Sequence, residues 1–171
     1  TGVQTCALPI YDEAEIPMPA EQPQVSWTIA DEATLVDQWR REHPGQLALL
    51  VDGTLSVNAP EANAIALATA TDALVIDTAL LSAQQDQALA SILSEDGLIL
   101  HDLKGCIHAL GARGWTLGKA HTDLLLAAYL VNSEHRGYQL DQLFAQYLGV
   151  DSQEKKDSTT QPPNYGSEGG G

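Results

Sequence analysis

Short apolar runs separated by turn residues occupy the first half of the chain after residue 24, and this pattern predicts strands. The run LALLV at 47–51 is continuously apolar, which is typical of a strand buried on both faces. Asp52-Gly53 follows it as a turn signal, so we expect a hairpin there. The strands predicted in this part are residues 25–29, 47–51, 54–57, 64–70 and 73–77. We expect the last four to form an antiparallel meander.

Apolar residues then recur at helical spacing, and capping residues begin the segments. Ser82 and Asp102 are the expected N-caps of two helices, and Asp31 is the expected N-cap of an earlier one. Helices are predicted from Asp31 to the His43-Pro44-Gly45 stop and over 82–95, 103–113, 122–131 and 139–148, with a short strand at 98–100. This order of elements predicts an α/β domain with a mixed sheet flanked by helices.

The predicted helices each carry an apolar stripe that we expect to face the core. The core candidates on these stripes are Leu35, Val36, Trp39, Leu89, Ile92, Leu93, Leu103, Cys106, Ile107, Leu110, Leu125, Tyr129, Leu140, Leu143, Phe144 and Tyr147.

The two ends differ from this folded part. Residues 1–10, TGVQTCALPI, match one translated frame of a common sequencing-library adapter, so we interpret them as an adapter-derived scar outside the fold. Residues 11–24 are acidic and Pro-rich, which predicts an extended linker, and 151–171 are polar and Gly-rich, which predicts a disordered tail. One domain over 25–150 remains, and we expect the chain to be a fragment of a longer protein.

Composition limits the possible classes of function. The chain has 171 residues, 23 Asp and Glu against 8 Lys and Arg, and a net charge of −15. An apolar fraction of 44% is typical of a globular protein, and no apolar run approaches the roughly 20 residues that span a bilayer. The acidic balance argues against a chain that grips nucleic acid by itself, because neutralising phosphates needs a basic face. We therefore expect a soluble protein, no membrane partner and weak DNA binding by the isolated chain.

Residue spacing alone does not assemble an active site. Asp52 ends a predicted strand, where sites gather in α/β sheets, although an Asp-Gly pair can simply make a turn. Cys106 lies near the start of a predicted helix, whose dipole could lower a thiol pKa, but a lone cysteine on an apolar face is more often inert. The five histidines are scattered without zinc-ligand spacing.

Three segments together resemble a known family. They are LALLVDGT at 47–54, LILHDLKGCIHALGARGWTLG at 98–118 and TDLLLAAYLVNSEHRGYQLDQLFAQYLG at 122–149. In this order they resemble the 3′–5′ exonuclease-like domain of bacterial DNA polymerase I, family A, particularly of the actinobacterial kind. The resemblance covers 25–150 and implies a ribonuclease H-like fold, here with its C-terminal helix missing.

The resemblance also implies where catalytic residues would lie. Active members place four carboxylates around two divalent metals. Asp52 matches the first carboxylate, but Thr54 and Cys106 stand at the next two positions, and the last motif would lie beyond the chain. Asp123 matches an acidic family position that we interpret as a helix cap. We therefore expect no competent catalytic residue, no metal site and no cofactor, with Asp52 the one retained candidate ligand.

The function implied is that of a catalytically degenerate, structural exonuclease-like domain. Its parent would be a DNA polymerase of the bacterial cytoplasm, active in replication and repair, which would bind DNA and use Mg²⁺. The polymerase domain would be an intramolecular partner. One alternative is an active ribonuclease D-like nuclease in which Asp77, Asp102 or Asp123 joins Asp52 at a metal. Another is a free-standing acidic interaction domain.

Overall fold

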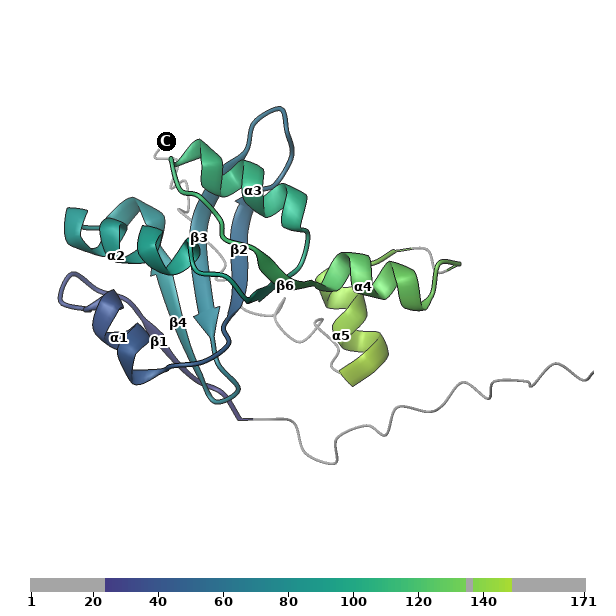
Figure 1. Ribbon diagram of the computed structural model, residues 1–171, viewed down its shortest axis with the longest axis horizontal. Helices are drawn as coiled ribbons and strands as arrows, with labels where there is room; N and C mark the ends of the chain where they lie inside the picture. Colours follow the sequence, from purple (N-terminus) through teal and green to yellow (C-terminus); the bar gives the residue numbers. More distant parts are fainter. Residues whose placement is uncertain (1–23, 135–136, 149–171) are drawn as a thin grey trace, which may run out of the picture. The chain divides into compact units, whose positions relative to one another are not determined.

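A six-stranded mixed sheet organises the fold, with strand order β1-β4-β3-β2-β5-β6 (Figure 1). The structure, a computed structural model, describes residues 24–134 and 137–148. The strands are β1 (Ser26–Ile29), β2 (Ala48–Thr54), β3 (Glu61–Ala68), β4 (Asp72–Asp77), β5 (Leu98–Leu100) and β6 (Ala120–Asp123). The helices are α1 (Val36–Glu42), the 3-10 turn η1 (Thr78–Leu80), α2 (Ala83–Leu93), α3 (Leu103–Ala112), α4 (Leu124–Val131) and α5 (Leu140–Leu148).

The strand pairing confirms the mixed sheet and an antiparallel meander, but of three strands. The predicted strand at 54–57 is wrong, because β2 ends at Thr54 and the chain is irregular until β3 begins at Glu61. β2 pairs with β3 and β3 with β4, both antiparallel. The other pairings, β1 with β4, β2 with β5 and β5 with β6, are parallel. The chain divides into two compact units at residue 140, where α5 starts, so α5 is described separately from the sheet. The predicted scar, the tail and all of the linker but Gln24 lie outside the described residues.

The prediction that 47–51 is buried on both faces is wrong. Leu47, Leu49 and Val51 are buried, whereas Ala48 and Leu50 between them are exposed. Residues alternate between the two faces of a strand, so this pattern means that one face of β2 is covered and the other is open. The run is apolar throughout, yet its two sets of side chains have different environments.

The predicted turn at Asp52-Gly53 is also wrong, because β2 continues through it to Thr54. Asp52 pairs with Ala64 and Gly53 with Ala62, so the register shifts by one residue between them. Such a bulge bends a strand and re-aims its side chains. Gly53 has φ +148°, and a Cβ there would overlap the carbonyl of Glu61. Close approach to β3, rather than a chain reversal, explains this glycine.

Helix caps were predicted well where the capping side chain bonds to its own helix. Ser82 accepts from the N–H of Gln85, and the Gln85 side chain accepts from the N–H of Ser82, which is a capping box for α2. Asp31 is not the N-cap of α1, which is Leu35. The Asp31 carboxylate instead accepts from the N–H of Ala33 and the hydroxyl of Thr34, closing a separate turn before the helix begins.

The segment 122–131, predicted as one helix, divides into two elements. Its first two residues belong to strand β6, whose sequence AHTD has no apolar alternation, and α4 begins at Leu124. Strand β6 forms because its backbone pairs with β5, from Leu98–Ala120 to Leu100–Asp123. Such tertiary pairing overrides local sequence pattern.

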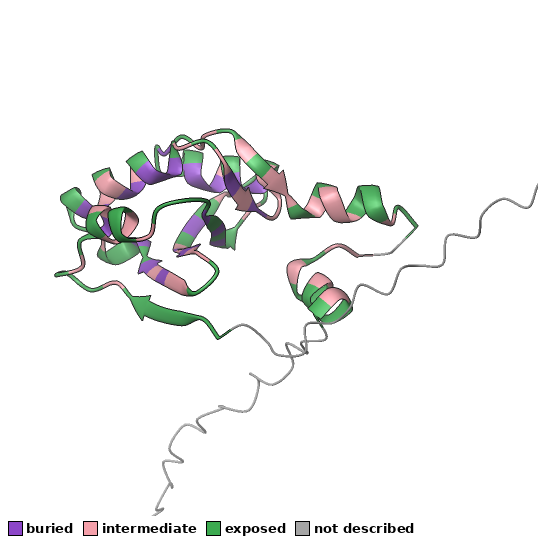
Figure 2. Cartoon of the chain, turned by 60° about the horizontal axis from the view of Figure 1, so that its bottom comes forward, coloured by how far each residue is buried: buried purple, intermediate pink, exposed green. Residues whose placement is uncertain are grey.

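The core lies between the sheet and helices α1, α2 and α3, on one side of the sheet (Figures 1 and 2). Its largest fully buried side chains are Leu47, Ile65, Leu67, Leu74, Ile76, Leu89, Leu93, Leu100, Leu110, Val36 and Cys106. The core predictions for Leu35, Ile107, Tyr129 and Phe144 are wrong, because these side chains are between 43 and 51% exposed. Helical spacing identifies an apolar stripe but not what covers it.

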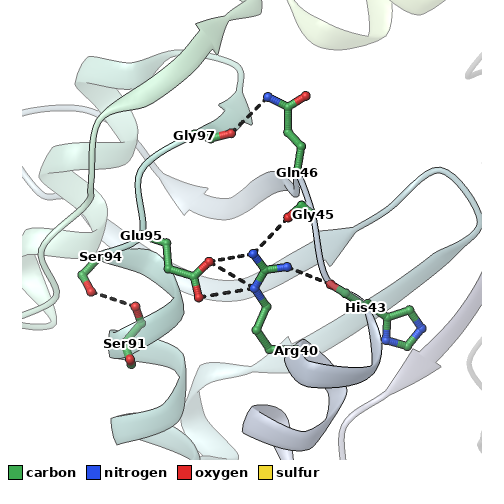
Figure 3. A network of polar contacts seen from close by, with 8 residues as sticks. All are labelled: Arg40, His43, Gly45, Gln46, Ser91, Ser94, Glu95 and Gly97. Carbon is green, nitrogen blue, oxygen red and sulfur yellow. Dashed lines mark hydrogen bonds and ion pairs between the residues drawn. The ribbon is translucent and has the colours of Figure 1, made fainter.

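A polar cluster fastens α1 to the segment between α2 and β5 (Figure 3). The Arg40 guanidinium pairs with both carboxylate oxygens of Glu95, at 2.7 Å for the shortest N–O distance. It also donates to the carbonyls of His43 and Gly45, so it holds the end of α1 and the following loop. Because one planar guanidinium donates to four acceptors at once, this cluster stabilises the fold more than an exposed ion pair does.

Replacing Gly53 with alanine tests the close approach of β2 and β3. We expect G53A to lower the free energy of unfolding by at least about 2 kcal/mol, because the new Cβ meets the Glu61 backbone at a positive φ. Urea unfolding followed by circular dichroism measures it. The matched control is G111A, where a Cβ on α3 meets nothing within 4 Å and the change stays within about 1 kcal/mol. Equal effects of the two substitutions would contradict the bulge geometry.

The Arg40 cluster predicts unequal roles for two adjacent arginines. R40A should cost about 2 kcal/mol of unfolding free energy, because several charge-assisted hydrogen bonds are lost together. R41A should cost less than about 0.5 kcal/mol, because Arg41 makes an exposed ion pair with Asp37 one helical turn away. The same urea titration compares them. A loss for R41A as large as for R40A would show that the cluster contributes no special stability.

Candidate functional site

Asp52 lies on the open side of the sheet. It is exposed and occupies the same side as Leu50, two residues earlier on β2. Thr54, two residues later, is also exposed. The structure thus brings Asp52 and Thr54 to one end of one strand, as the resemblance implied, and presents a single carboxylate and a neutral hydroxyl.

Cys106 lies on the opposite, buried side. Its side chain is 1% exposed in α3, and its Sγ lies 3.6 Å from the backbone carbonyl oxygen of His101. Burial, with smaller contributions from the nearby carboxylates of Asp102 and Asp123, raises the pKa of the Cys106 thiol from 9.0 to about 12. The possibility that the helix dipole lowers this pKa is therefore wrong in sign. The structure supports the interpretation of Cys106 as an inert core thiol.

Asp123 joins the starts of two helices. Its Oδ1 accepts from the N–H groups of Asp102 and Leu125, and its Oδ2 accepts from the N–H of Leu103, all at 2.9–3.0 Å. It is therefore the N-cap of α4, as predicted, and it also satisfies backbone donors at the start of α3. One carboxylate satisfies three N–H groups at the β5–α3 and β6–α4 junctions.

Asp102 caps α3, as predicted, in a strained conformation. Its Oδ1 accepts from the N–H of Gly105 at 3.0 Å, and its backbone is left-handed with φ +65°. A Cβ at residue 105 would overlap the Asp102 carboxylate and crowd Leu55, so glycine there lets the cap form. The Asp102 carboxylate is committed to the helix start.

Strand pairing places Asp77 in the same row across the sheet as Asp52. Asp52 and Asp77 pair with Ala64 from either side, so they lie two strand spacings, about 10 Å, apart. Asp77 Oδ1 accepts from the N–H of Ala79 and caps η1. Sequence reasoning missed this shared row, since only the register of the sheet shows it.

The donor set does not suit Mg²⁺. Among residues 24–134 and 137–148, no three His, Cys, Asp or Glu side chains are grouped so that they could hold a metal ion. Mg²⁺ prefers several oxygen ligands in octahedral geometry. Asp52 and Thr54 offer one charge, and Cys106 is a buried, protonated sulfur. The side chains at these three positions therefore do not fit the metal that the resemblance associates with them.

Solved nucleases share this architecture. Brucella melitensis NrnC with bound Mg²⁺ superposes with a TM-score of 0.55 at 16% identity, over 75% of this chain and 63% of that chain. The RNase D of Trypanosoma brucei gives 0.58 at 13% identity, over 77% and 50%. The fold is the ribonuclease H-like fold of 3′–5′ exonucleases, as predicted.

Sequence relatives identify a smaller group among proteins of this fold. The chain is 40% identical over 119 residues to DNA polymerase I of Mycobacterium tuberculosis (strain ATCC 25618 / H37Rv), and 37% identical over 123 residues to that of Mycobacterium leprae (strain TN). These matches cover 66 and 68% of this chain. The chain is homologous to a part of DNA polymerase I of mycobacteria, and it spans 13–14% of the length of these relatives.

One structural neighbour agrees with the sequence relatives. The POL domain of Pol1 from M. smegmatis, solved in complex with DNA primer–template and dNTP, matches with a TM-score of 0.66 and 36% identity. The match covers 72% of this chain and 23% of that one. No family model matches the chain. Within the part of the chain that the structure describes, no helix combines the length and the apolar character needed to cross a membrane.

The raised pKa of Cys106 predicts a loss of stability in alkali. The thiol ionises near pH 9 in the unfolded chain and near pH 12 in the folded one, so stability is complete below pH 9 and falls as the pH rises toward 12. We expect wild type to lose about 1.4 kcal/mol per pH unit above pH 9 relative to C106A. Urea titrations at pH 8, 10 and 10.5 measure the difference. A constant difference between the two proteins would contradict a buried, protonated thiol.

Proposed function

We propose that the chain is a catalytically degenerate 3′–5′ exonuclease-like domain of a DNA polymerase I polypeptide, in which it acts as a structural module. The observation that carries this proposal is the environment of Cys106. The family resemblance puts a metal-binding carboxylate at this position, and the structure has a 1% exposed thiol with a pKa of about 12. A protonated sulfur in the core supplies neither negative charge nor an oxygen ligand to a magnesium ion.

The first family motif supports the same proposal. Asp52 retains its carboxylate at an exposed position on β2, while Thr54 has a hydroxyl where the family has a glutamate. Two-metal nucleases stabilise both the attacking and the leaving oxygen of the phosphodiester, which needs ions held firmly in place. A single carboxylate on an open sheet face holds such ions poorly.

The alternative, an active ribonuclease D-like nuclease, needs other carboxylates at Asp52. The three candidates already serve as helix caps: Asp77 for η1, Asp102 for α3 and Asp123 for α4. Moving Asp123 toward a metal would release three backbone N–H groups at two helix starts. These commitments favour the degenerate domain over the nuclease.

The similarity to DNA polymerase I supports two proposed partners, DNA and the polymerase domain of the same polypeptide. A net charge of −15 makes the chain a weak DNA binder by itself, so contact with DNA would come through the polymerase part of the same polypeptide. Mg²⁺ would be the cofactor of that polymerase part. The whole polypeptide would be located in the bacterial cytoplasm, where DNA is replicated and repaired. The role of the domain would be to pack against the polymerase domain and help to fix its geometry.

A nuclease assay tests the proposal. The purified chain, and the polymerase polypeptide that contains it, are incubated with 5′-labelled primer–template and Mg²⁺ or Mn²⁺. We expect no metal-dependent shortening from the 3′ end above background, and D52A should equal wild type, because Asp52 holds no metal. Degradation that requires metal and is abolished by D52A would overturn the proposal and favour the ribonuclease D-like alternative.

The cap variant D123A is the matched control. As a structural residue, Asp123 should matter for stability and not for degradation, so D123A should lower the unfolding free energy by about 2–3 kcal/mol. D52A should change it by less than about 0.5 kcal/mol, because Asp52 is exposed. Loss of nuclease activity in D123A at temperatures where it remains folded would instead place Asp123 at an active site.

A further inference from the structure

Strand β1 lies at one edge of the sheet and pairs, among the described residues, with β4 alone. The backbone N–H groups of Ser26 and Ala30 donate to carbonyl groups on the β4 side, at 2.8 Å each. Successive N–H and C=O groups of a strand point to opposite edges. Those of Val25, Trp27 and Ile29 therefore point away from the sheet, along its free edge.

Both faces of β1 are exposed as well as this edge (Figure 2). Trp27 is 66% and Ile29 61% exposed. An exposed edge strand can pair with another extended chain, and proteins prevent such pairing with charged side chains, proline or a β-bulge. The segment VSWTIA at 25–30 has no charged residue and no proline, and its register with β4 is continuous.

The opposite edge of the sheet differs in this respect. Strand β6 stands at the other end of the strand order, and its sequence is AHTD. It contains His121 and Asp123 and directly follows Lys119. Charged and titratable side chains thus interrupt the edge formed by β6 and leave the edge formed by β1 as the one suited to pairing.

We propose that two copies of the chain associate by antiparallel pairing of their β1 strands about a two-fold axis, with Trp27 opposite the same residue of the second copy. This inference goes beyond the proposed function and does not rest on it.

The sequence of this edge is complementary to itself. In either direction, VSWTI runs through a β-branched aliphatic residue, a hydroxyl residue, Trp, a hydroxyl residue and a β-branched aliphatic residue. Antiparallel pairing about Trp27 therefore puts Val25 opposite Ile29 and Ser26 opposite Thr28. The residues whose backbone groups face the free edge are opposite one another, so each such pair exchanges two hydrogen bonds. Aromatic and β-branched pairs across the strands add to the stability of the contact.

The contact is small and works against the charge of the chain. Strand β1 has four residues, and a short edge strand limits pairing. Each copy has a net charge of −15, so the two copies repel one another, and salt screens this repulsion because β1 itself is uncharged. We expect a Kd between about 10 µM and 1 mM, which is typical of a weak interface, and tighter association as salt is raised.

Sedimentation equilibrium of the 171-residue chain at 10 and 500 µM tests the association. The weight-average mass should rise toward that of a dimer, and the Kd should tighten at least twofold between 0.05 and 0.5 M NaCl. W27K should weaken the Kd at least tenfold, because two like charges then lie directly opposite. The matched control is L80K, which changes the net charge equally at a 69% exposed side chain on η1 and should leave the Kd within twofold.

Three results would overturn the proposal. They are a monomer mass at 500 µM, equal effects of W27K and L80K, and association that weakens as salt is raised, which would indicate a contact between charged surfaces instead.

Amide exchange in the unsubstituted chain gives a second measurement, which does not depend on a folded variant. Followed by NMR at 20 µM and 1 mM, exchange of the Trp27 and Ile29 amides should slow at least about twofold at the higher concentration. The amides of β6, at the opposite edge, should not change. Equal slowing at both edges would indicate unspecific association and would contradict pairing through β1.

Disulfide formation tests the register of the two strands. W27C and L80C are made in a C6S background in which the buried Cys106 is retained, and cross-linking by oxidised glutathione is followed on non-reducing gels. Opposite residues that exchange hydrogen bonds have Cα atoms about 5.5 Å apart, within the range of a disulfide. W27C should form linked dimers at least tenfold faster than L80C. Equal rates would overturn pairing about Trp27.

Discussion

Burial of only one side of the sheet is the constraint on which the rest of the structure depends. The side chains of β2, β3 and β4 that point toward α1, α2 and α3 form the core, and those that alternate with them are exposed in β2 and mostly half-buried in β3 and β4. The same division separates Asp52, on the outward side, from Cys106, in the core. It also leaves Leu50 on the outward side of β2 exposed. The position of each candidate ligand is therefore a consequence of how one layer of helices covers one sheet.

Local patterns predicted the elements better than their environments. Ser82 and Asp102 act on backbone donors within three residues, so the sequence around each sufficed to place α2 and α3. The apolar run at 47–51 could not reveal which of its side chains a helix covers, because both sets are apolar. Strand β6 was missed because its pairing with β5 depends on residues about twenty positions away.

The candidate site was predictable only in part. The resemblance selected Asp52, Thr54 and Cys106. Asp52 and Thr54 are exposed on β2, whereas Cys106 is buried in the core. The Asp-Gly pair at 52–53, expected to turn the chain, is a bulge within a strand, because Gly53 passes close to the Glu61 backbone. The shared row of Asp52 and Asp77 could not be read from spacing, since it depends on the register of three strands.

Metal binding at Asp52 is the property on which the proposed function turns. Titration of the 171-residue chain with Mn²⁺, with free Mn²⁺ followed by electron paramagnetic resonance, measures it directly. A single carboxylate on an open face predicts a Kd weaker than about 1 mM and no difference between wild type and D52A. Stoichiometric binding with a Kd tighter than about 0.1 mM, lost in D52A, would contradict the account.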